Sequence, residues 1–167
     1  MKLATHLQQK YSLNACNEIV QWVGHSQTRF DELFKLFTGK DALLSYRAAA
    51  PVNYCVEAHP DLLKKHWSAF VKNLLQANLN DAVKRNSIRI LQCVDIPKRH
   101  QGAVMDICFR YVESPNEAVA IKAFSLTVLY NLSKLYPEII PEVKTLIEIQ
   151  WPNQTAAFRV RAKVFMK

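Results

Sequence analysis

The chain has 167 residues, of which 50% are hydrophobic and 22% are charged. This composition excludes a disordered chain, and 3 glycines with 7 prolines exclude collagen-like and other Gly/Pro-rich classes. The length fits one domain, and so few glycines argue against an all-β fold with many tight turns.

The charge is strongly basic, because 22 Lys and Arg residues face 14 Asp and Glu residues and give a formal net charge of +8. A basic chain favours an anionic partner, which can be nucleic acid, an acidic protein or a membrane surface. The first residues carry no apolar signal-peptide core, and no stretch approaches the roughly 18 uninterrupted apolar residues of a membrane helix. We therefore expect a cytoplasmic protein with no membrane partner.

Helical spacing of apolar residues recurs along almost the whole chain, and no alternating run is long enough for a strand. The sequence predicts two short helices within 2–24, followed by amphipathic segments at 27–38, 62–75, 104–112 and 143–149. Pro60, Pro97 and Pro137 each stand just before such a segment. Proline suits the first position of a helix, where its missing N–H would have no helical partner.

An apolar residue followed by a basic one recurs at Tyr46-Arg47, Val83-Lys84, Ile121-Lys122 and Val160-Arg161. The basic residues are 37, 38 and 39 positions apart. Six positions before each basic residue stands a type that often begins a helix, namely Asp41, Asn78, Asn116 or Thr155. Arg85 can also be aligned with Arg47, which would place Cys93 on Cys55. A constant period of this length indicates repeated helical pairs.

Each predicted pair has a first, amphipathic helix, a short turn, and a second helix that carries the apolar-basic mark. The pairs cover about 28–58, 60–95, 97–135 and 137–167, and residues 2–24 cap the N-terminal end. The second helices are the more apolar, which is typical of helices packed on several sides. We predict one all-α solenoid domain over 1–167.

The repeated mark resembles the Asp…Val-Arg element of HEAT repeats, in the HEAT/armadillo class of small bacterial-type proteins. The resemblance covers about 28–167 and implies a right-handed α-solenoid that binds partners on its concave or edge surfaces. It also implies a ladder between neighbouring repeats. The residues of that ladder would be Asp41, Arg47, Lys84, Lys122 and Arg161. Thr155 and two asparagines replace the family's Asp, and a proline that kinks a helix is found only at Pro51.

Cys55, His59 and His66 form the best candidate for a metal site. Cys55 and His59 are four residues apart on one helix face, but zinc needs three or four converging ligands, and His59 fits a helix end. No local signature surrounds a Ser-His-Asp or Cys-His nucleophile. Glu138 and Glu142 are typical of a solvated helix face. We therefore expect no catalytic residue, no metal and no cofactor.

The cysteines show no C-x-x-C spacing, and their neighbours are apolar. A chain of this length does not need disulfides for stability. We therefore expect Cys16, Cys55, Cys93 and Cys108 to be buried free thiols.

Basic residues at helical spacing are the candidate partner-binding residues. Arg85 and Arg89 are four apart, as are Arg159 and Lys163 near the C-terminus, and all four would project from second helices. The simplest alternative is a solvated basic face. Nucleic-acid binding needs such charges and, for single strands, exposed aromatic residues, which are not evident in the sequence. The HEAT-like architecture also occurs in DNA alkylation-repair glycosylases, whose catalytic aromatic and acidic residues cannot be placed on this chain.

The sequence thus predicts a non-catalytic module that binds or scaffolds macromolecules. A repeat surface without a deep cavity suits another protein as partner, with nucleic acid as the alternative. The last helix has no following pair. We expect Phe158, Val164 and Phe165 to leave an apolar edge there, through which two copies associate weakly.

Overall fold

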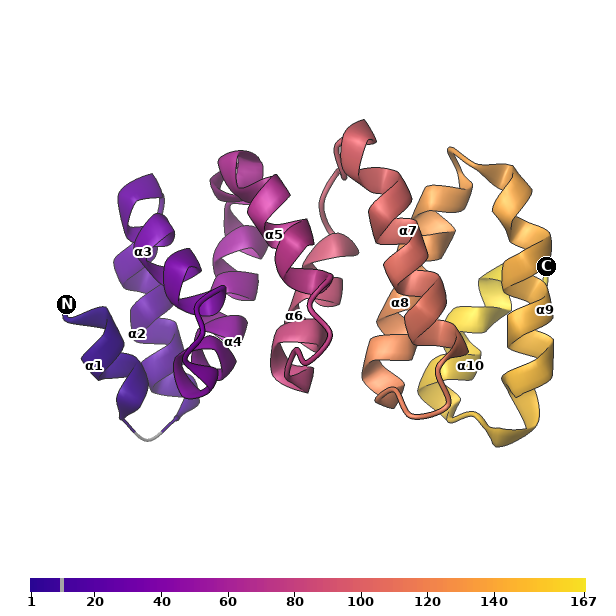
Figure 1. Ribbon diagram of the computed structural model, residues 1–167, viewed down its shortest axis with the longest axis horizontal. Helices are drawn as coiled ribbons and strands as arrows, with labels where there is room; N and C mark the ends of the chain where they lie inside the picture. The colour runs from indigo at the N-terminus through magenta and orange to yellow at the C-terminus, as the bar shows by residue number, and fades with distance from the viewer. Residues whose placement is uncertain (10) are drawn as a thin grey trace. The chain divides into compact units, whose positions relative to one another are not determined.

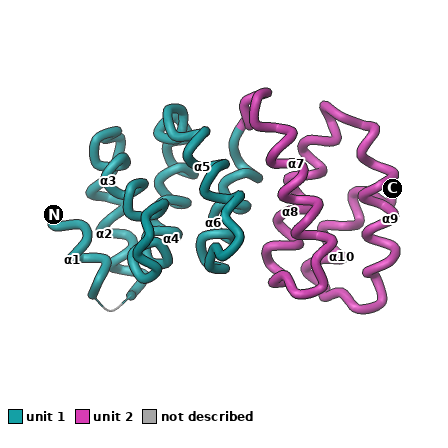
Figure 2. The backbone as a smooth tube through the Cα atoms, in the orientation of Figure 1, with its two compact units in different colours: residues 1–94 teal, residues 95–167 magenta. Residues whose placement is uncertain are grey.

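The structure is a computed structural model that describes residues 1–9 and 11–167. Over these residues the secondary structure is helical, without a strand (Figure 1). The all-α helical-repeat fold predicted from the sequence is confirmed. The chain divides into two compact units, 1–94 and 95–167 (Figure 2). Their boundary falls between the second and third predicted helical pairs.

Unit 1 contains the N-terminal helices and the first two predicted pairs. Its α-helices are α1 (Leu3–Gln8), α2 (Leu13–Val23), α3 (Gln27–Phe37), α4 (Ala42–Ala58), α5 (Trp67–Leu74) and α6 (Asp81–Leu91), and α5 follows the 3-10 helix η1 (Pro60–His66). The centre of the unit is α4, which packs against α1, α2, α3, α6 and η1. The long second helix of the first pair is therefore the framework on which unit 1 is built.

Several helices of unit 1 begin where a side chain accepts a hydrogen bond from a free backbone N–H. Ser12, Ser26 and Asp41 cap α2, α3 and α4 in this way. The cap of α6 is Asn80, whose Oδ1 accepts from the Val83 N–H at 2.9 Å. The prediction that Asn78 begins this helix is therefore wrong by two residues, because the turn before α6 is longer than the constant spacing assumed.

The core of unit 1 is made of large apolar side chains that are almost completely buried. Phe30 and Phe37 on α3, Leu63 on η1, Phe70 on α5 and Ile88 on α6 are all fully buried. Trp67, which belongs to the amphipathic segment predicted at 62–75, is also buried. This core holds α4 and α6 in place and leaves one side of each helix for other contacts.

Unit 2 contains the third and fourth predicted pairs. Its helices are α7 (Lys98–Glu113), α8 (Val119–Ser133), η2 (Pro137–Ile139), α9 (Ile140–Gln150), η3 (Trp151–Asn153), α10 (Ala156–Ala162) and η4 (Lys163–Phe165). Here α8 packs against both α7 and α10, as expected for a helix that is apolar on most sides. Thr155 caps α10 as predicted, but α8 begins after Ala118 rather than at Asn116.

The apolar edge predicted at the last helix has a different composition. Phe158 and Phe165 are buried inside unit 2, so they cannot form an exposed edge, and this part of the prediction is wrong. Val164 is exposed as expected, together with Val160 and Met166. Both phenylalanines, Phe158 on α10 and Phe165 on η4, pack into the core of unit 2 because burial removes their large apolar rings from water.

Candidate binding surface

The first candidate pair, Arg85 and Arg89, lies on α6. The Arg85 side chain is exposed and has no hydrogen-bond or ion-pair partner among residues 1–9 and 11–167. Arg89 donates from Nε to the Glu57 carboxylate at 3.2 Å, and its guanidinium lies over the Tyr54 ring at 5.5 Å. The Arg89 side chain nevertheless remains 41% exposed. Both arginines can therefore reach a partner.

Tyrosine side chains lie beside these arginines. Tyr46 and Tyr54 stand two turns apart on α4, and Tyr46 is 53% exposed while Tyr54 is partly exposed. Tyr11 precedes α2 and is 49% exposed. Burial raises the pKa of Tyr11, the neighbouring Cys16, Tyr54 and Tyr46 raise it further, and Arg85 opposes them. Tyr11 also lines a small pocket with Arg47 and Pro51 of α4, so it lies against the helix that carries the other two tyrosines.

The geometry of α4 and α6 explains why the two sets of residues meet. Asn80 Nδ2 lies 3.4 Å from Ser45 Oγ, and the Arg89 guanidinium lies over Tyr54. Both contacts join residues 35 positions apart. The constant offset means that α4 and α6 run in the same direction, side by side. By this register Arg85 on α6 is level with Ala50, which lies between Tyr46 and Tyr54 in the sequence of α4.

We call the surface formed by Tyr11, Tyr46, Tyr54, Arg85 and Arg89 the Tyr/Arg surface. The sequence-based statement that exposed aromatic residues beside basic ones are not evident is wrong for unit 1. The spacing of Tyr46 and Tyr54, eight residues apart on one helix face, was the signal that could have indicated it. Nothing in that spacing alone shows that this face of α4 stays exposed.

The second candidate pair, Arg159 and Lys163, lies in unit 2. Arg159 is half-buried, donates from a terminal nitrogen to the Trp151 carbonyl at 3.0 Å, and lies over the Trp151 ring at 5.4 Å. Lys163 is exposed at the start of η4. Arg159 thus fastens η3 to α10 within the unit, which leaves Lys163 as the more accessible cation of the pair.

The predicted ladder residues of unit 1 contact backbone groups and a neighbouring carboxylate. Asp41 accepts from the N–H groups that begin its own helix α4. Arg47 donates to the carbonyl of Leu7 at 2.9 Å and to that of Gln9, so it fastens the end of α1 to α4. Lys84 lies 3.7 Å from Asp81 on the same helix.

The ladder residues of unit 2 join different helices. Lys122 is only 4% exposed, and its Nζ donates to Gln150 Oε1 on α9 at 3.0 Å. Burial lowers the pKa of Lys122, while the charge of Glu117 raises it. The Arg161 guanidinium lies over the Phe124 ring of α8 at 5.1 Å. A ladder that continues from repeat to repeat stays a prediction.

The three metal candidates have different neighbours. Cys55 is buried in α4, the His59 ring lies 3.7 Å from the His25 ring, and His66 Nε2 lies 2.7 Å from Asp31 Oδ1. In the part of the chain that the structure describes, no group of three or more His, Cys, Asp or Glu side chains is arranged to hold a metal ion.

The buried thiols of Cys16, Cys55 and Cys108 are poor candidates for nucleophiles. Burial raises the pKa of Cys16 to about 11 and those of Cys55 and Cys108 to about 12. An activated cysteine needs a lowered pKa and access to solvent. Cys93 is exposed, so the prediction that every cysteine is buried is wrong at this position.

A HEAT repeat domain model matches residues 3–167, which is nearly the whole chain. The chain belongs to the HEAT repeat family. The resemblance inferred from the apolar-basic mark is thereby confirmed, and it extends to the N-terminal helices α1 and α2. The searches of curated proteins and of solved structures gave no match. Among the described residues of this HEAT repeat chain, no helix has the length and apolar character needed to cross a membrane.

Proposed function

We propose that this HEAT repeat chain is a non-catalytic module that binds another protein and so holds proteins together. HEAT repeats commonly mediate protein interactions. The observation that carries the proposal is the Tyr/Arg surface, on which three tyrosines and two arginines are exposed or partly exposed on a rigid helical core. Tyr and Arg are the side chains that most often dominate binding energy at protein interfaces.

Nucleic-acid binding is the second candidate function. Arg85 is exposed and unpaired within the described residues, and tyrosine rings beside it could stack on unpaired bases. The affinity of the chain for nucleic acid would fall steeply as the salt concentration rises, because each phosphate contact releases counterions.

We place the protein in a reducing compartment such as the cytoplasm. Cys55 and Cys108 are buried free thiols, and buried unpaired thiols are typical of proteins from reducing compartments.

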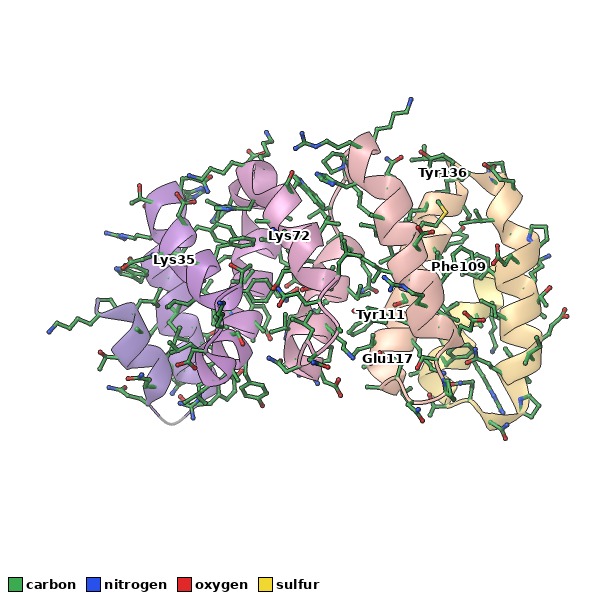
Figure 3. All side chains as sticks on the ribbon, in the orientation of Figure 1. Lys35, Lys72, Phe109, Tyr111, Glu117 and Tyr136 are labelled. Atoms are coloured by element: carbon green, nitrogen blue, oxygen red, sulfur yellow. The ribbon has the colours of Figure 1, made fainter. Side chains whose placement is uncertain are left out.

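Quantitative affinity purification from native cells tests the proposed function. The bait is the full chain, and the variant R85E/R89E is compared with K35E/K72E, which reverses two exposed lysines on α3 and α5 (Figure 3). Each variant makes two charge reversals, so net charge changes equally in both. We expect specific protein partners to be lost with R85E/R89E and retained with K35E/K72E. Equal loss in both variants, or capture of nucleic acid alone, would contradict the proposal.

A further inference from the structure

We propose that the Tyr/Arg surface of unit 1 binds an acidic segment of the partner protein, with carboxylates on the arginines and an apolar side chain against the tyrosines. This inference rests on the proposed function and specifies the chemistry of the partner.

Arg85 supplies the site for the first carboxylate. It is exposed on α6 at the level of Ala50, and it has no hydrogen-bond or ion-pair partner among residues 1–9 and 11–167. A guanidinium presents five N–H donors in a planar fork that matches a carboxylate. Hydrogen bonds between a guanidinium and a carboxylate are charge-assisted and are stronger than neutral hydrogen bonds.

Arg89 supplies the second site, one helical turn further along α6. Its Nε bonds to Glu57, and the Tyr54 ring supports the guanidinium plane. Both contacts fix the orientation of the fork before a partner arrives. The terminal nitrogens of Arg89 remain for a carboxylate that approaches from solvent. Two arginines at this spacing fit acidic residues placed at intervals along one segment.

The exposed tyrosines supply the apolar part of the interface. A tyrosine ring offers a large, rigid contact area with only two side-chain torsions to restrict. Tyr46 on α4 is 53% exposed, so an apolar side chain of the partner can rest against its ring. The combination favours a segment in which acidic and apolar residues alternate.

Two observations favour a protein segment over a nucleic acid. Leu43 lies one turn before Tyr46 and is 46% exposed, and Leu13 near Tyr11 is also exposed. Aliphatic side chains contact apolar side chains but have no π-face on which bases stack. Glu57 also lies in the surface, where it would repel a backbone with a phosphate at every nucleotide. A peptide can place its carboxylates so that they avoid Glu57.

Fluorescence anisotropy with labelled probes tests this inference. The probes are a peptide in which Asp and Glu alternate with Leu and Phe, its Asn/Gln counterpart, and a single-stranded oligonucleotide of similar length. We expect the full chain to bind the acidic peptide at least about tenfold more tightly than either other probe. We expect R85E/R89E to lose about tenfold or more in affinity, and Y46A to lose about fivefold, as for hot-spot side chains.

The controls distinguish the possible failures. K35E/K72E should bind within about twofold of the natural chain, and R85A, which removes a side chain without a described partner, keeps the test valid if R85E/R89E misfolds. Equal losses in R85E/R89E and K35E/K72E would overturn the inference, because net charge alone would explain binding. Tighter binding of the oligonucleotide would overturn it in favour of nucleic acid. Another outcome is that the acidic peptide fails to bind while R85E/R89E still loses its partners in affinity purification. That result would overturn the inference that the partner segment is acidic, and it would leave the proposed function intact.

Discussion

At the scale of single residues, Asp31 shows how charge stabilises unit 1. Its carboxylate lies 2.5 Å from Lys65 Nζ and 2.7 Å from His66 Nε2, and it accepts from Gln27 Nε2 at 2.9 Å. Partial burial alone would raise the pKa of Asp31, but hydrogen bonds from Lys65, Gln27 and His66, with the charge of Lys65, lower it to about 2. This contact joins α3 to η1.

The lowered pKa of Asp31 predicts how stability depends on pH. Its contribution is present above the unfolded pKa of about 3.9 and is lost as pH falls through the folded value. D31N should therefore reduce the free energy of unfolding by about 1 kcal/mol at pH 6, a value reduced for solvent screening. This difference should vanish only when the pH is well below about 2, where Asp31 is protonated in both states. Urea unfolding across this range measures it, with D106N, at an exposed carboxylate on α7, as control, and a pH-independent difference would refute the assignment.

The capping residue of α6 gives a second prediction at this scale. Asn80 accepts from the Val83 N–H, whereas Asn78 is exposed in the preceding turn. N80A should lower the free energy of unfolding by about 1 kcal/mol, because the start of α6 loses its hydrogen bond. N78A should change it by less than about 0.5 kcal/mol, as is usual for exposed positions. The reverse order in chemical denaturation would show that α6 begins at the position the constant spacing indicates.

At the scale of elements, the pairing of helices could be predicted from sequence, while the binding surface could not. Amphipathic spacing and helix-capping residues depend on local sequence, so the segment predicted at 27–38 agrees with α3 (Gln27–Phe37) to within one residue. The exposure of Tyr46 depends on which face of α4 remains uncovered when α6 packs beside it. That packing is a tertiary contact between residues 35 positions apart, and no local pattern contains it.

The exposed side of α10 and η4 gives a prediction about self-association. Val160 and Val164 are four residues apart and exposed, and Met166 follows them. We propose that two copies associate weakly through this edge, since burying such side chains removes apolar surface from water. V160E should weaken the association by about tenfold, as expected for placing a charge in an apolar contact. Sedimentation velocity over a concentration series measures it, and a strict monomer at high concentration would contradict the proposal.

At the scale of the whole molecule, the two compact units predict unequal local stability. In repeat proteins each unit is stabilised mainly by its own and neighbouring contacts, so parts of the chain can open separately. Leu63 is fully buried in unit 1, and L63A should cost about 2–5 kcal/mol there. Hydrogen exchange should then accelerate more for amides in 1–94 than for those in 95–167. Equal acceleration throughout the chain would show a single cooperative unit instead.

We propose that this HEAT repeat chain binds another protein through the exposed side of α4 and α6. The most direct measurement places the photo-crosslinker p-benzoylphenylalanine at position 46 in native cells, with position 35 on α3 as a matched exposed control. We expect a nuclease-resistant protein adduct at position 46 and not at position 35. The same adducts at both positions, or an adduct at position 46 that nuclease removes, would contradict it.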